Sequence, residues 1–167
     1  MPAIFGLAVA NHIILEIAGY PHDYLPSKSR DKMYDGILGL LQGAEERIAR
    51  SFGFESQGLK IPFTQDDVGY LVEEVYHGRS VVSGLTTRLC LCRWIRPKGN
   101  FIDKRTPGQN NSLLQMKELV LMTKDEAAKH EKQVLKGEKV PEDLYEAEVV
   151  DTVRRMMEEE QRFERFR

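Results

Sequence analysis

The spacing of hydrophobic and polar positions predicts a mixture of helices and strands. Residues 29–52 carry apolar side chains three and four positions apart, typical of one face of an amphipathic helix: Met33, Ile37, Leu40, Leu41, Ala44, Ile48 and Phe52. Residues 80–95 have branched apolar side chains on both faces, which favours a strand in the centre of a sheet. Residues 117–122 indicate a second, shorter strand.

The N-terminal segment is the most apolar part of the chain. Residues 1–18 are nearly all apolar, and Gly19, Tyr20 and Pro21 follow them. Because Ile and Val are enriched and no helical stripe stands out, we expect two buried strands that turn at residues 11–12, with a buried helix as the alternative. The apolar run is too short for a membrane span and lacks a preceding basic region, so we expect neither a signal peptide nor membrane association.

Helix-start signals locate three further helices. Thr64 can cap the amides near Asp67, and Thr123 forms a capping box with Glu126. Pro141 is suited to the first turn of a final helix, which we expect to continue to residue 167.

These elements predict an α+β fold with a mainly antiparallel sheet of about four strands, covered by helices, and a long C-terminal helix. We expect one domain over residues 1–137 and an amphipathic helical tail over residues 138–167 that serves as an interaction element.

Composition and cysteine usage restrict the class of protein. The chain has 167 residues, with 24 basic and 26 acidic side chains and a net charge of −2, which excludes a histone-like polycation. Cys90 and Cys92 are one residue apart on a predicted strand, where two side chains cannot bridge each other. Free thiols indicate a reducing compartment, so we expect a cytoplasmic or nuclear protein.

Two features favour contact with a protein partner. Gly36, Gly39 and Gly43 share one stripe of the first amphipathic helix, where another backbone could approach closely. That backbone could belong to the same chain or to a partner. In the tail, four apolar side chains could dock in a partner's groove or fold back on the core: Met156, Met157, Phe163 and Phe166.

Basic and aromatic residues are interleaved in residues 88–105, which contain six basic side chains and one acidic side chain. Such a segment can contact phosphates and stacked bases, although an acidic protein could use it equally well. The candidate contact residues are Arg93, Trp94, Arg96, Lys98, Lys104 and Arg105.

No local motif identifies a catalytic centre. The histidines and the pair Cys90 and Cys92 lack the spacing of a metal site, and no phosphate-binding glycine motif or nucleophile motif occurs, so we expect no metal and no cofactor. The leading hypothesis is therefore a non-enzymatic subunit of an intracellular complex, a homo- or hetero-oligomer. The alternative is a nucleic-acid-contacting subunit, and the third is an enzyme whose active site is dispersed along the chain.

Overall fold

The fold is built around one antiparallel pair of strands. The structure is a computed structural model that describes residues 2–20, 30–55, 57–103 and 110–163. Strand β1 (Leu89–Arg93) pairs with β4 (Leu119–Thr123), and Leu91 lies opposite Leu121. A second antiparallel pair joins β2 (Ile102–Asp103) to β3 (Asn111–Ser112). The α+β class is therefore confirmed, but the predicted sheet of about four strands is two separate pairs.

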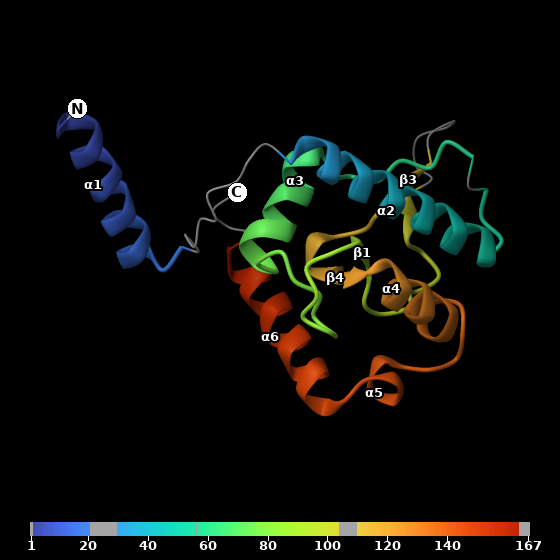
Figure 1. The fold of residues 1–167 in the computed structure, drawn as a ribbon. Coiled ribbons are helices and arrows are strands. Elements are labelled where there is room, and N and C mark those ends of the chain that lie inside the picture. The colour runs from blue at the N-terminus through green and yellow to red at the C-terminus, as the bar shows by residue number, and fades with distance from the viewer. Residues whose placement is uncertain (1, 21–29, 56, 104–109, 164–167) are drawn as a thin grey trace.

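Helices cover both faces of the β1–β4 pair, as the sequence pattern of residues 89–93 requires. Alternate side chains of a strand point to opposite faces. Leu89 and Leu91 pack in a cluster with α2 (Asp31–Ser51), α3 (Gln65–Tyr70) and the π-helix η1 (Leu71–Val75). Cys90 and Cys92 pack in a second cluster with α4 (Lys124–His130) and α6 (Ala147–Phe163). In Figure 1, α2 lies above the strands and α6 lies below them.

A third apolar cluster joins the far end of α2 to the second strand pair. Ile48 of α2 packs near Phe101 and Ile102, together with Leu135 of the π-helix η3 (Glu131–Leu135). Phe101 also contacts two other phenylalanine rings edge to face. This cluster fixes the segment that runs from β1 into β2.

The predicted helix starts are confirmed. Thr64 accepts a hydrogen bond from the Asp67 amide at the start of α3, and Thr123 does the same for Glu126 at the start of α4. These caps depend only on residues three positions apart, so the sequence shows them directly.

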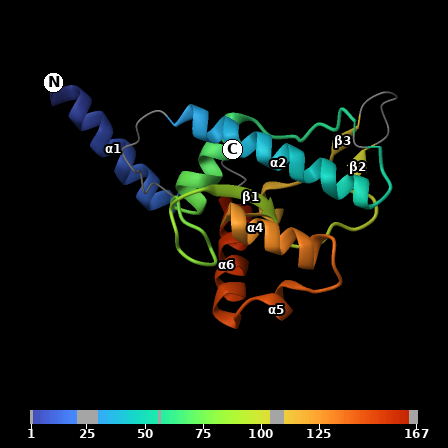
Figure 2. The ribbon, with the colours of Figure 1, turned by 45° about the vertical axis from the view of Figure 1, so that its right-hand side comes forward.

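The prediction of two buried strands in residues 1–18 is wrong. Residues Pro2–Ala18 form helix α1, and the side chains of residues 3–18 are exposed except for the half-buried Leu15: Phe5 is 73% and Ile17 is 82% accessible. Figure 1 shows α1 set apart from the strands and the other helices, and Figure 2 shows its first turns pointing away from them. A helix satisfies its backbone hydrogen bonds within one segment, whereas a strand needs a neighbour, and none lies beside α1 in the described ranges.

Two further elements are shorter than expected. The predicted strand over residues 80–95 is reduced to β1, because Gly84 and Arg88 adopt positive φ angles of 70° and 53° that interrupt extended backbone. The predicted final helix is two helices, α5 (Pro141–Leu144) and α6, because the extended backbone of Tyr145 separates them. A short 3-10 turn, η2 (Met116–Glu118), directly precedes β4. No helix within the described ranges has the length and apolarity to cross a membrane.

Candidate nucleic-acid interface

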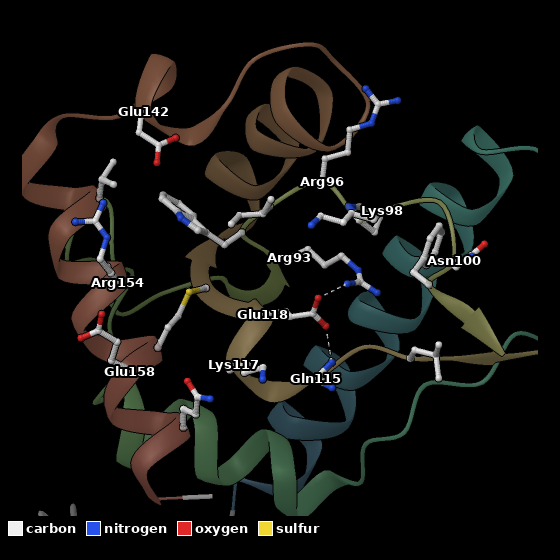
Figure 3. Close-up of a pocket in the computed structure, with 18 residues that line it drawn as sticks. Arg93, Arg96, Lys98, Asn100, Gln115, Lys117, Glu118, Glu142, Arg154 and Glu158 are labelled. Atoms are coloured by element: carbon white, nitrogen blue, oxygen red, sulfur yellow. Dashed lines mark hydrogen bonds and ion pairs between the residues drawn. The ribbon is translucent and has the colours of Figure 1, made fainter.

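A pocket of about 600 Å³ opens between the segment that follows β1, the segment that precedes β4, and helices α5 and α6. Figure 3 shows these walls, with Arg93, Arg96 and Lys98 on one side of the pocket and Arg154 and Glu158 of α6 on the other. The lining residues are Arg93, Trp94, Ile95, Arg96, Pro97, Lys98, Asn100, Phe101, Leu113, Gln115, Lys117, Glu118, Glu142, Val150, Arg154, Met157, Glu158 and Gln161.

Three stacked aromatic side chains form a floor, of which only Trp94 itself lines the pocket. Trp94 is only 5% exposed and stacks on His130 with ring centroids 5.3 Å apart and planes 9° apart. Tyr145 stacks on the same indole at 5.2 Å. The three rings therefore pack on one another within the fold.

Hydrogen bonds determine which ring nitrogen of His130, one of the three stacked rings, carries the proton. Its Nε2 lies 3.0 Å from the Trp94 carbonyl oxygen, which can only accept, and its Nδ1 lies 3.0 Å from the Tyr145 hydroxyl. Burial lowers the pKa of His130, which favours the neutral ring. The neutral imidazole therefore donates from Nε2 and accepts at Nδ1, and the floor carries no charge of its own.

Arg93 is a buried residue of the pocket wall that forms ion pairs with two glutamates. Its side chain is 2% exposed, and its Nε and Nη2 donate to the two carboxylate oxygens of Glu45 at 2.7 and 3.0 Å. Its Nη1 donates to Glu118 at 3.2 Å, while Ser112 donates to Glu45 at 3.0 Å. Two carboxylates thus neutralise this guanidinium, which ties the pocket wall to α2.

Two lysines at the pocket, Lys98 and Lys117, carry positive charges that no acidic side chain in the described ranges neutralises. Neither Lys98 nor Lys117 forms an ion pair or hydrogen bond with another residue in the described ranges. Arg96 differs, because it donates to the Gly137 carbonyl oxygen at 2.8 Å and lies 5.0 Å above the Phe52 ring. Arg154 pairs with Asp151 at 2.8 Å on the exposed surface of α6.

The structure brings together four of the six basic and aromatic residues predicted to contact nucleic acid. Arg93, Trp94, Arg96 and Lys98 all line the pocket, although the first two are buried. Lys104 and Arg105 lie outside the described residues. Sequence reasoning missed Lys117 and Arg154, since no local pattern connects them to residues 88–105. Nucleic-acid contact by this set stays a prediction.

The residues predicted to contact a protein partner are dispersed. A Cβ atom added at Gly36 or Gly39 would meet nothing within 4 Å, and one at Gly43 would lie 3.4 Å from Arg47 of the same helix. No other backbone in the described ranges therefore approaches the glycine stripe.

The predicted tail residues separate in the same way. Met156 packs against the first core cluster, and Met157 lines the pocket. The side chain of Phe163 and the whole of Phe166 lie outside the described residues, so their docking stays a prediction.

The two thiols are unsuited to nucleophilic chemistry. Burial raises the pKa of Cys90 to about 11 and raises the pKa of Cys92 as well, so both thiols are protonated at neutral pH. Neither cysteine lines the large pocket. Across the part of the chain that the structure describes, no three His, Cys, Asp or Glu side chains cluster in a way that could hold a metal ion.

Comparison with known proteins finds similarity to tRNA-modifying enzymes. The chain is 36% identical, over all 167 of its residues, to tRNA threonylcarbamoyladenosine dehydratase 2 of Saccharomyces cerevisiae. It is 35% identical over 162 residues, 96% of its length, to tRNA threonylcarbamoyladenosine dehydratase 1 of the same yeast. The chain spans about a third of the length of these relatives, 33% in each case. No protein-family model matches it.

These relatives overturn the leading hypothesis from the sequence. A non-enzymatic complex subunit is the wrong class, because both similar proteins are named as enzymes that act on a tRNA nucleoside. The hypothesis depended on the glycine stripe, the apolar N-terminus and the C-terminal tail, and on missing local motifs. Such motifs are a poor guide when the aligned region is only a third of the related enzymes.

Proposed function

We propose that the chain acts in the dehydration of threonylcarbamoyladenosine in tRNA and supplies a surface that binds the tRNA. The observation that carries this proposal is the 36% identity over the whole chain to a dehydratase named for this nucleoside. This similarity covers the whole chain and a third of the length of that enzyme.

The charge of the pocket supports a role in binding RNA. The chain as a whole carries −2, which would repel a polyanion. Apart from the buried and neutralised Arg93, the pocket is lined by four cationic and three anionic side chains, and two of the cations, Lys98 and Lys117, have no partner within the described ranges. Ammonium groups that are free of internal ion pairs can replace the counterions of RNA phosphates.

The chemistry of the pocket favours substrate binding over bond breaking as the contribution of this region. Its accessible ionisable groups are ammonium, guanidinium and carboxylate groups, while the thiols and His130 are buried and do not line the pocket. The proposal includes a reducing compartment, which the two free thiols support.

A cellular test reads the modification directly. The gene segment that encodes the chain is removed in the source organism, and total tRNA is digested to nucleosides and analysed by mass spectrometry. We expect the dehydrated nucleoside to disappear and threonylcarbamoyladenosine, heavier by one water molecule, to accumulate. Restoring the unchanged segment should restore the dehydrated form. An unchanged nucleoside profile after removal would refute the proposal.

A matched pair of variants then tests the binding surface. Restoring the segment with Lys98→Ala and Lys117→Ala should lower the dehydrated fraction, because tRNA affinity falls. Lys32→Ala with Lys129→Ala removes the same charge from exposed helix positions outside the pocket and should leave the fraction unchanged.

A further inference from the structure

We infer that helix α1 inserts into an apolar groove of a polypeptide equivalent to the two-thirds of the yeast dehydratases that this chain does not match. This inference rests on the proposed function, and it names the partner that a tRNA-binding region needs for the dehydration itself. Helix α1 is then the contact with that partner, while the pocket stays open for tRNA.

Helix α1 carries most of the exposed apolar surface of the structure. More than half of the large apolar side chains that are exposed in the described ranges lie on this one helix. No residue of α1 belongs to any of the three apolar clusters within those ranges, and Figure 2 shows its first turns pointing away from the other helices. A large exposed apolar surface of this kind marks a site of contact with another molecule.

The apolar side chains of α1 point to all four sides of the helix. Ile4 and Ile13 are nine positions apart, which at roughly 3.6 residues per turn places them on opposite sides, and they are 69% and 50% exposed. Phe5 and Ile14 have the same separation about a quarter turn away, and they are 73% and 64% exposed. A helix that is apolar all round is typical of a protein interior, whereas a surface helix keeps one polar side.

The sequence gives α1 a defined end but too little local stability to form alone. Gly19, with a φ of 62°, follows the last turn, and the Tyr20 amide donates to the Leu15 carbonyl oxygen at 3.0 Å, as in a Schellman cap. Isolated helices of about 15 residues are marginal in water even when they are rich in alanine, and β-branched side chains such as isoleucine favour the helix less. The 17 residues of α1 therefore need apolar neighbours to pack against.

The chemistry and shape of α1 select the kind of neighbour. The helix contains no lysine or arginine, so it has no cation that could bind RNA phosphates. A second copy of α1, or a flat surface, would cover one side of the helix and leave the opposite side exposed. A groove of a folded polypeptide, lined by apolar side chains, covers several sides at once, so it is the neighbour that fits.

The relatives indicate which polypeptide supplies this groove. The match to tRNA threonylcarbamoyladenosine dehydratase 2 covers all 167 residues of the chain, so α1 lies within the matched region. The chain matches only 33% of that enzyme, so most of the related enzyme is polypeptide outside this match. Because the pocket is proposed to bind tRNA, the bond-breaking step is assigned to that other polypeptide, and α1 holds it next to the bound tRNA.

Photo-cross-linking in the source organism tests which polypeptide covers α1. A photoreactive phenylalanine analogue replaces Phe5 or Ile14 in the protein as the organism makes it, and the cross-linked peptides are sequenced by mass spectrometry. We expect both positions, on opposite sides of α1, to cross-link to peptides that resemble the unmatched two-thirds of the yeast dehydratases. Cross-links to a second α1, to lipid or to tRNA would overturn the inference, as would cross-links from one position only or from neither.

A matched pair of aspartate variants tests whether the apolar surface of α1 causes the contact. Leu7→Asp places a carboxylate on α1 at a position that is 72% exposed, and the cost of burying it in an apolar groove should lower the cross-link yield from position 5 about tenfold. Leu85→Asp makes the same change at a 56% exposed position outside α1 and should leave the yield unchanged. Equal yields in the two variants would overturn the inference.

Misfolding does not confuse this comparison. Leu7 belongs to no apolar cluster of the described ranges, so the rest of the fold does not depend on it. The fluorescence of Trp94, the single tryptophan of the sequence, should therefore be the same in the purified Leu7→Asp chain as in the unchanged chain.

Failure of this inference is distinguishable from failure of the proposed function. If removal of the chain abolishes nucleoside dehydration in cells but α1 does not cross-link to the expected polypeptide, the docking of α1 is wrong and the proposed function stands. If α1 cross-links as expected but removal of the chain leaves the nucleoside profile unchanged, the proposed function is refuted and the contact of α1 stands.

Discussion

Helix α1 and strand β1 have similarly apolar sequences, but α1 is exposed and β1 is buried. Residues 3–10 and 89–92 are both apolar runs, and we expected strands from each. The second run is buried on both faces between α2 and α6, while the first is an exposed helix apart from the rest of the fold. Apolar composition therefore favours burial, but a segment is buried only where other elements of the chain pack against it.

The buried ion pair at the end of β1 should give the largest effect on stability. Arg93→Ala leaves the Glu45 carboxylate buried without its cation, which costs about 3–5 kcal/mol of unfolding free energy. Urea denaturation measures the loss. The control is Arg88→Ala, whose pair with Asp125 is mostly exposed and should contribute less than about 1 kcal/mol. Equal effects of the two variants would show that burial of the pair does not matter.

Truncation of apolar side chains sharpens the comparison directly. Leu121→Ala, in the strand opposite β1, should cost about 2–5 kcal/mol because the side chain is fully buried. Leu7→Ala in α1 makes the same chemical change at an exposed position and should stay within about 0.5 kcal/mol. A large loss in the α1 variant would mean that α1 packs against the fold in solution.

Stability should fall in mild acid because of His130. Its pKa is lowered in the folded protein from the ordinary 6.5, so the unfolded chain binds the proton more readily. The resulting stability is fully present above pH 6.5 and declines as the pH falls from 6.5 toward the folded pKa, by at most about 1.4 kcal/mol per pH unit. The check is the unfolding free energy measured as a function of pH below 6.5. In His130→Gln, the decline that His130 causes should be absent. A wild-type stability that does not change with pH would contradict the burial argument.

The glycine stripe of α2 should give the smallest effect and the opposite sign. Gly36→Ala and Gly39→Ala place a methyl group in open space and should each raise stability by about 0.5–1 kcal/mol, seen as a higher Tm. If a partner backbone packs on this stripe, the same variants should weaken that association in sedimentation experiments. Unchanged association would leave the glycines without a role in partner binding.

Much of the secondary structure could be predicted, because it depends on close neighbours. The amphipathic face of α2 and the caps at Thr64 and Thr123 follow from side chains three or four positions apart. Strand ends were harder, since the positive φ of Arg88 has no sequence signature. Residues 93–98 could be selected as a basic and aromatic segment, but their different exposures could not be predicted.

The sequence by itself determined the α+β class, the positions of α2, α3 and α4, and a concentration of positive charge in residues 88–105. Only the tertiary structure decided which cations are available, because ion pairing depends on distant residues. Glu45 of α2 neutralises Arg93, while Lys98 is left without a partner in the described ranges and lies at one pocket with Lys117. Local periodicity encodes which side of an element is buried. The chemistry of a pocket depends on long-range packing, which one-dimensional spacing does not contain.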